Sequence, residues 1–384
     1  MFITNTVKYA GVNDRKTDLF EGQYKVPEGI SYNSYVVFGE KTAVIDSVDK
    51  DFGNEWLDNL EKILNGKTPD FLVVLHMEPD HSANIAKFLQ KYPSARVVSN
   101  SKSFVMMENF FGKGVAPNRI EVKDGECLDL GGRTLKFISA PMVHWPEVMF
   151  AYDDADKILF SADAFGKFGD LRSNGGWDDE AARYYFGIVG KYGVQVQSVL
   201  KKAAALDIKI ICPLHGEVLS ENLAHYISLY NMWSSYAAEK SGVVICYTSV
   251  YGNTKAAAEL LKEELTARGE SVVIYDLART DSSLALSEAF RYDRLVLATT
   301  TYNGEIFPAM REFINELVGH NFRNRKIGII ENGSWAPVVK RKAEEMLSAC
   351  GNIAFAETSV KILSALNEKN INEIKKLAEE IGNK

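Results

Sequence analysis

Four side chains that can bind metal ions lie within six residues of one another in the first third of the sequence. They are His76, Glu78, Asp80 and His81, directly after an apolar run at residues 71–75. Such a run predicts a buried strand, so the four groups fall in a strand-to-helix loop that can turn their side chains toward one point. Asp80 could instead cap a following helix, but capping alone does not explain the whole group. The spacing therefore predicts a metal site.

Three further candidate ligands each follow a later predicted strand. They are His144, Asp163 and His215. The carboxyl ends of strands form the edge at which α/β sheets gather their sites. Taken singly, each has an ordinary explanation, because a lone histidine is more often a packed or surface residue and Asp163 could cap a helix. The two remaining histidines, His225 and His320, are interpreted in that ordinary way.

The donor set narrows the choice of metal. The imidazoles and carboxylates together make seven donors, which are too many for one first-row ion and suitable for two. Asp163 is the natural bridge, since one carboxylate has two oxygens to share. A carboxylate-rich site with imidazoles and no thiolates suits iron or manganese, with zinc as an alternative. So many imidazoles disfavour magnesium or calcium.

Cysteine usage and charge exclude several other classes of protein. Cys127, Cys212, Cys246 and Cys350 include no C-x-x-C pair, so this chain alone does not build a rubredoxin-type iron centre or an iron–sulfur cluster. We interpret them as reduced thiols of a cytoplasmic protein. No signal peptide or membrane-spanning run of about 18 apolar residues is visible. The net charge of −7 disfavours a nucleic-acid partner.

Three loops in the second half carry another group of candidate residues. The first leads from a strand into a helix, where hydroxyl and backbone N–H groups can hold a phosphate, although such a turn can also be a simple N-cap. No G-x-x-x-x-G-K-[ST] or G-x-G-x-x-G motif is present. In the other loops, aromatic faces can flank a flat ring and glycines let the backbone approach it. The candidate contacts are Thr248, Ser249, Val250, Tyr251, Gly252, Asn253, Thr254, Thr300, Thr301, Tyr302, Asn303, Gly304, Asn332, Gly333, Ser334 and Trp335.

The elements that must position these loops alternate regularly along the second half. The predicted strands are 243–247, 271–276, 294–298, 326–330 and 353–356, and the predicted helices are 255–267, 284–292, 309–318, 338–349 and 368–380. This alternation predicts a parallel sheet covered on both faces, a doubly wound flavodoxin-like domain. In strand order 2-1-3-4-5, the three loops converge at one edge.

The first half has a different pattern. The predicted strands are a hairpin at 35–38 and 42–45, followed by 71–75, 96–98, 134–139, 157–160 and 209–212. Their long and irregular connections predict a layered α/β or α+β fold. A helical stretch at 221–238 closes this half, so we expect one domain at 1–240 and another at 241–384.

The segments that carry these candidate ligands resemble those of a known family. His76-Met77-Glu78-Pro79-Asp80-His81-Ser82 resembles the metal loop of the metallo-β-lactamase superfamily. Hydrolases of that superfamily usually carry His at the position of Glu78. A Glu at this position resembles the flavodiiron proteins, also called A-type flavoproteins. The segments 144–149, 161–163 and 212–216 are similar to that family's other ligand segments, and the three later loops resemble the FMN site of flavodoxin. The resemblance covers nearly the entire chain, and it implies an α/β protein with an N-terminal metallo-β-lactamase-like αββα sandwich followed by a doubly wound flavodoxin-like domain.

The resemblance also implies the cofactors, FMN and two non-haem iron ions, and their ligands. One iron would be held by His76, Glu78 and His144, and the other by Asp80, His81 and His215, with Asp163 bridging. Members of the family can leave one of these histidines unbound, and for His81 that alternative stays open. No side chain is assigned as a dedicated acid or base.

The implied activity is the reduction of O2 to water, of NO to N2O, or both. The resemblance implies a separate rubredoxin-like electron donor and a head-to-tail homodimer or a dimer of dimers. Two alternatives remain: a dinuclear zinc hydrolase fused to a flavodoxin module, and a non-enzymatic flavin electron carrier or redox sensor. Glu78 and the paired redox domain argue against the hydrolase, and the seven filled ligand positions argue against the carrier.

Overall fold

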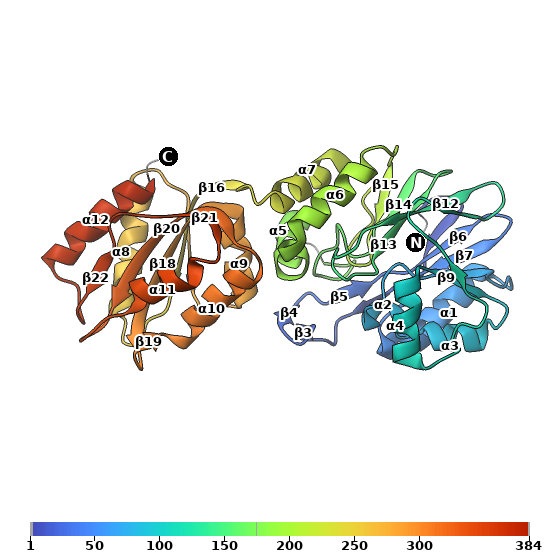
Figure 1. Cartoon of the computed structure of the whole chain (residues 1–384), viewed down its shortest axis with the longest axis horizontal. Coiled ribbons are helices and arrows are strands. Elements are labelled where there is room, and N and C mark those ends of the chain that lie inside the picture. The colour runs from blue at the N-terminus through green and yellow to red at the C-terminus, as the bar shows by residue number, and fades with distance from the viewer. Residues whose placement is uncertain (1–2, 174, 383–384) are drawn as a thin grey trace. The chain divides into compact units, whose positions relative to one another are not determined.

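The computed structural model describes residues 3–173 and 175–382 and divides into two units. Unit 1 comprises Met1–Tyr185 and Val194–Asn231, and unit 2 comprises Phe186–Gly193 and Met232–Lys384. Figure 1 shows both ribbons with their elements labelled. Among the described residues, no helix is both long enough and apolar enough to cross a membrane.

Unit 1 contains two main sheets. The first has the order β1 (Val7–Tyr9), β6 (Tyr35–Phe38), β7 (Thr42–Ile45), β8 (Phe71–Val73), β9 (Arg96–Ser99) and β10 (Ile120–Glu121). The second has the order β11 (Cys127–Asp129), β12 (Thr134–Ser139), β13 (Met149–Asp153), β14 (Ile158–Phe160) and β15 (Ile210–Cys212). The predicted hairpin is confirmed, because β6 and β7 pair antiparallel.

Helices cover the outer faces of the two sheets in unit 1. The helices of this unit are α1 (Gly53–Leu64), α2 (Pro79–Ser82), α3 (Ile85–Lys91), α4 (Ser101–Phe111), α5 (Trp177–Tyr184), α6 (Gly193–Ala203) and α7 (Leu223–Ser234), of which the short α2 lies beyond the end of β8 and covers no face. Two short pairs, β2 (Val12–Asp14) with β5 (Ile30–Tyr32) and β3 (Leu19–Phe20) with β4 (Tyr24–Lys25), complete the unit. The inner faces of the sheets meet where Tyr35 and Phe160 pack with ring centroids 5.4 Å apart. The fold is the expected αββα sandwich.

This sandwich explains why the strands are almost continuously apolar. Every residue of β7, β8, β13 and β14 is buried. A strand whose two faces are both covered cannot alternate apolar and polar residues. Helix α1 contributes one apolar face, and its Trp56 packs on Phe88 of α3 at 5.8 Å between ring centroids.

Unit 2 is built on a parallel sheet in the expected order. The strands run β17 (Val272–Asp276), β16 (Lys240–Tyr247), β18 (Tyr292–Tyr302), β20 (Arg323–Asn332) and β21 (Gly351–Phe355), which is the order 2-1-3-4-5. Two short strands were not predicted: β19 (Glu305–Ile306) pairs antiparallel with β18, and β22 (Val360–Ile362) pairs parallel with β20. The doubly wound fold is confirmed.

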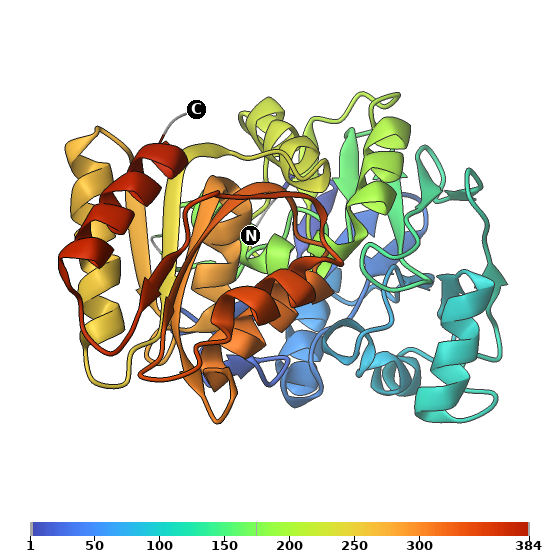
Figure 2. The ribbon, with the colours of Figure 1, turned by 60° about the vertical axis from the view of Figure 1, so that its left-hand side comes forward.

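Helices lie on both faces of the sheet in unit 2. On one face are α8 (Asn253–Ala267) and α12 (Glu368–Gly382), and on the other are α9 (Ser282–Arg291), α10 (Pro308–Gly319) and α11 (Val339–Leu347), as Figure 2 shows. Leu261 and Leu265 of α8 and Leu377 of α12 are fully buried against Val296 of β18. Residues 186–193 also belong to this unit, since Phe186 stacks on Phe290 at 4.8 Å.

We predict that Leu377→Ala lowers the free energy of unfolding of unit 2 by about 2–5 kcal/mol, because a fully buried leucine leaves a cavity when truncated. Leu363→Ala is the control: that side chain is 56% exposed, and we expect a change of no more than about 0.5 kcal/mol. Equilibrium urea unfolding measures both values. Equal effects of the two substitutions would contradict this description of the core.

Candidate metal centre and flavin-binding loops

All seven predicted donors lie beyond strand ends in unit 1. They follow four strands: β8 (His76, Glu78, Asp80 and His81), β12 (His144), β14 (Asp163) and β15 (His215). Asp80 and His81 lie in the short helix α2 rather than in an open loop, because Pro79 fixes its φ at the first helical position. Residues 162–165 form a turn, so Asp163 caps no helix there.

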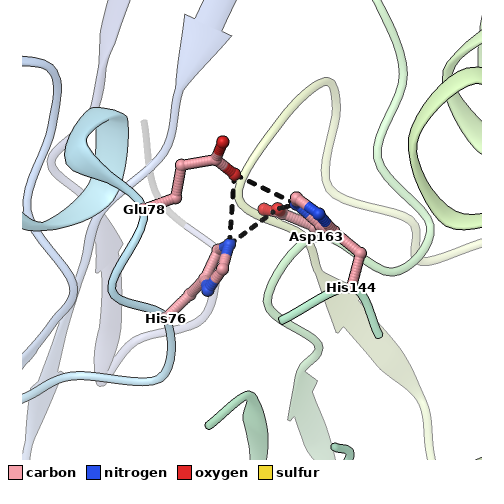
Figure 3. A group of neighbouring side chains, drawn as sticks. All are labelled: His76, Glu78, His144 and Asp163. Carbon is pink, nitrogen blue, oxygen red and sulfur yellow. Dashed lines mark hydrogen bonds and ion pairs between the residues drawn. The ribbon is translucent and has the colours of Figure 1, made fainter. Parts of the chain in front are cut away.

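The first group of donors is formed by His76, Glu78, His144 and Asp163, which face one another in Figure 3. His76 Nε2 lies 3.2 Å from Glu78 Oε2 and 3.3 Å from Asp163 Oδ2. His144 Nε2 lies 3.0 Å from the same two oxygens. One ligand atom from each of the four residues therefore faces the same small space, which is large enough for one metal ion.

The second group contains Asp80, His81 and His215. Asp80 Oδ2 lies 3.2 Å from His81 Nε2 and 3.4 Å from His215 Nε2. The two imidazole Nε2 atoms are 3.1 Å apart. Three donors thus face one another here, next to the first group.

Asp163 joins the two groups. Its Oδ2 faces His76 and His144, whereas its Oδ1 lies 3.2 Å from His81 Nε2 and 3.8 Å from His215 Nε2. The side chain is 1% exposed. Each oxygen of one buried carboxylate is therefore directed at a different set of donors, which is the arrangement that a bridging ligand requires.

The donor set fits two metal ions. Asp80 Oδ1, Asp80 Oδ2 and Asp163 Oδ1 are buried without a hydrogen-bond partner among the described residues. Buried polar atoms are nearly always satisfied, and a carboxylate oxygen left over in this way is accounted for by a cation. The mixture of imidazoles and carboxylates suits a first-row transition metal, iron among them.

Two hydrogen bonds fix the orientation of ligand imidazoles. His76 Nδ1 donates to Glu147 Oε1 at 2.8 Å, and His215 Nδ1 donates to the carbonyl oxygen of Ser31 at 2.8 Å. Each bond leaves Nε2 free to bind a metal. His81 differs, because its buried Nδ1 has no such partner in the described part of the chain. Glu147 was not predicted from the sequence, although it lies only three residues after His144.

Asp46 holds the backbone at the start of the metal loop by hydrogen bonds. Its Oδ1 accepts the backbone N–H of Leu75 at 2.7 Å and that of His76 at 3.4 Å. Burial raises the pKa of Asp46 to about 8, although these two hydrogen bonds oppose the shift. Sequence spacing gave no indication of this residue, because it lies 30 positions before His76.

The charges of the donors are complementary. Burial alone would raise the pKa of Asp163, but the imidazoles of His76 and His81 lower it well below its usual range. Burial alone would lower the pKa of His144, but hydrogen bonds to Asp163 and Glu78 raise it to about 9. The positive charge of protonated imidazoles thus balances the negative charge of the carboxylates. A bound metal ion supplies that positive charge instead.

Aromatic rings enclose the centre, and one cavity opens onto it. Phe20 and Tyr184 each pack on the His215 ring at 5.4 Å between centroids. A cavity of about 270 Å³, lined by Phe20, Glu78 and Asp80 among others, reaches the donors from the side of the β3–β4 hairpin. The opening admits a small molecule.

In unit 2, the three predicted loops converge on a pocket of about 110 Å³. It is lined by Ser249, Val250, Tyr251, Asn253, Thr254, Thr300, Asn332, Gly333, Ser334 and, unpredicted, Ser364. The N-terminus of α8 borders this pocket, and Gly252 at its N-cap has φ +92, which favours glycine. Hydroxyls and helix N–H groups together suit the phosphate of FMN.

The other predicted contacts lie outside that pocket. Thr248 is buried, with its hydroxyl 2.5 Å from that of Thr299, and Thr301 accepts the N–H of Val338. Asn303 and Gly304 form the turn between β18 and β19. Tyr302 and Trp335 are exposed by 47% and 82%. Such exposed rings are available to stack on a flat ligand.

We predict that Glu147→Gln lowers metal affinity about 10- to 100-fold, because His76 loses the carboxylate that orients its ring. The control Glu121→Gln changes an exposed residue of β10 and should have no effect. Elemental analysis after dialysis against a graded chelator measures the difference. Equal metal retention by both variants would contradict the orienting role.

Comparisons with known proteins agree with both units. A family model described as ODP family beta lactamase matches residues 30–216, and a flavodoxin domain model matches residues 244–345. The anaerobic nitric oxide reductase flavorubredoxin of Aliivibrio salmonicida is 30% identical over 348 residues, which cover 87% of this chain and 69% of that protein.

Solved structures share the fold of the whole chain. The rubredoxin oxygen:oxidoreductase of Desulfovibrio gigas has a TM-score of 0.93 at 24% identity, covering 100% of this chain and 97% of that one. A flavodiiron protein variant from Thermotoga maritima has a TM-score of 0.87 at 25% identity, covering 98% and 96%. On this evidence the chain belongs to the flavodiiron protein family, and it is an oxidoreductase whose cofactors are FMN and a non-haem diiron centre.

Proposed function

We propose that this protein reduces O2 to water, NO to N2O, or both, with electrons relayed through FMN to the diiron centre. The observation that carries the proposal is the position of Asp163 between two sets of donors. When bound, the two cofactors supply electron transfer and the reduction of a diatomic gas. The names of a nitric oxide reductase relative and of an oxygen:oxidoreductase neighbour support the two substrates.

The proposed ligand assignment follows the two groups of donors. His76, Glu78 and His144 would hold one iron, Asp80, His81 and His215 would hold the other, and Asp163 would bridge them. Glu147 and the Ser31 carbonyl hold two of the imidazoles in the tautomer that presents Nε2. The rings of Phe20 and Tyr184 exclude water from one side of His215.

In the second unit, the N-terminus of α8 and the hydroxyls beside it would bind the FMN phosphate. Tyr302 and Trp335 would flank the flavin ring, since both are exposed next to the loops that line the pocket. We therefore assign metal chemistry to residues 1–240 and flavin chemistry to residues 241–384.

A separate rubredoxin-like protein is the proposed electron donor. The four cysteines of this chain include no C-x-x-C pair, and Cys212 and Cys246 are buried. The word rubredoxin in the names of a relative and a neighbour supports this choice. We also propose that the protein is cytoplasmic and forms a head-to-tail homodimer or a dimer of such dimers. This part of the proposal rests on the family resemblance.

We predict that Asp163→Asn lowers gas consumption about 100-fold or more while FMN remains bound, because the amide cannot bridge two cations. Asp58→Asn, at an exposed position of α1, is the control and should retain full activity. Anaerobic assays with O2 or NO electrodes, alongside iron and flavin analysis, measure the effect. Full activity of Asp163→Asn would refute the assigned site.

We also predict that Trp335→Ala weakens FMN binding about tenfold, because an aromatic stacking partner contributes roughly 0.5–1.5 kcal/mol beyond its buried area. The control Phe110→Ala removes a ring of α4 that is 49% exposed in the other unit. Titration of flavin-free protein with FMN, followed by fluorescence quenching, gives both affinities. Unchanged affinity in Trp335→Ala would remove this residue from the flavin site.

A further inference from the structure

An apolar cavity of about 290 Å³ lies in unit 1 between the second sheet and the helices α6 and α7. Phe150, Leu159 and Ile211 line it from the sheet, and Val196 and Val199 line it from α6. It is separate from the opening beside the β3–β4 hairpin, since the two cavities share no lining residue. Nothing in the packing of an αββα sandwich requires an unfilled volume of this size, because protein interiors are normally close-packed.

The lining of this cavity favours apolar molecules over water. Its lining residues are all apolar except Tyr230, and the Tyr230 hydroxyl already accepts the backbone N–H of Phe165 at 2.5 Å. A buried water needs two to four polar partners, whereas an apolar cavity of roughly half this volume stays dry and takes up benzene or xenon. The chemistry of the wall therefore selects a small, uncharged, apolar ligand.

The position of the cavity relates it to the metal centre. Val143 lines it immediately before the donor His144, and Ala164 and Phe165 line it immediately after Asp163. All three of these residues are buried. The cavity thus ends at the two backbone segments that carry one imidazole of the first group and the carboxylate shared by both groups.

At its other end the cavity approaches the surface. Ile227 of α7, which also lines it, is 37% exposed, and Ala204 beyond the end of α6 is exposed. A molecule entering there would meet apolar side chains and Tyr230 before it reaches Val143 and Ala164.

We propose that this cavity holds the diatomic gas substrate and supplies it to the metal centre. The inference rests on the proposed function and names a binding site for its substrate. O2 and NO are small, uncharged and nearly apolar, so they concentrate in a dry apolar volume relative to water. Phe165, which lines the cavity two residues after Asp163, stacks its ring on Tyr230 at 4.2 Å between centroids.

Xenon binding to the holoprotein tests the occupancy of the cavity. In crystals under xenon pressure, we expect xenon beside Val199, and Val199→Phe should remove it by filling the space. Val194→Phe is the matched control, because it makes the same change on the same helix at a side chain that is 72% exposed. Ala203→Val, a smaller filling substitution at another lining position, serves if Val199→Phe does not fold.

Gas kinetics test the use of the cavity. We expect Val199→Phe to raise KM for the gas about threefold or more with kcat, iron and FMN unchanged, since access is impaired and chemistry is not. Val194→Phe should match the wild type. An unchanged KM in a variant that has lost xenon would overturn this inference alone, as would the absence of xenon from the wild type. Xenon binding by a wild-type holoprotein that consumes neither gas would instead overturn the proposed function.

Discussion

A carboxylate removed from water is costly unless cations or hydrogen-bond donors surround it. Asp163 is 1% exposed, and four imidazoles from three different strand ends face its two oxygens. Bringing those groups together requires both sheets of the sandwich, because His76 and His81 follow the first sheet and the other two histidines follow the second. The fold of unit 1 therefore determines the charge balance of its centre: sheets that did not pack face to face would deprive Asp163 of His76 and His81.

The two units position their ligand-binding groups in the same way. Each places its polar groups just beyond the carboxyl ends of strands, where side chains and backbone N–H groups are free of the sheet ladder. In unit 1 these groups are carboxylates and imidazoles, which suit metal ions. In unit 2 they are hydroxyls at the N-terminus of α8, which suit a phosphate. The chemistry of each unit thus follows from the residue types at strand ends, and the sheets supply only position.

Sequence reasoning predicted what depends on local pattern. Fully buried strands such as β8 and β14 appear as apolar runs, and the seven donors were found because they follow predicted strands. It missed what depends on contacts between distant segments. Glu147 acts on His76 from 71 positions away, and Ser31 acts on His215 from 184 positions away. The loop expected around Asp80 became a helix because of Pro79, and β19 and β22 are too short to produce a periodic pattern. Ser364 joins the flavin pocket only because β22 pairs with β20.

The central claim is that one carboxylate joins two iron ions, and Mössbauer spectroscopy of anaerobically purified, iron-57-enriched protein tests it most directly. The account predicts about two irons per chain, with spectra of a magnetically coupled pair in the oxidised protein. The absorption spectrum of the same sample should give about one FMN for each pair. Two isolated, uncoupled iron sites, or zinc filling both positions, would contradict the account.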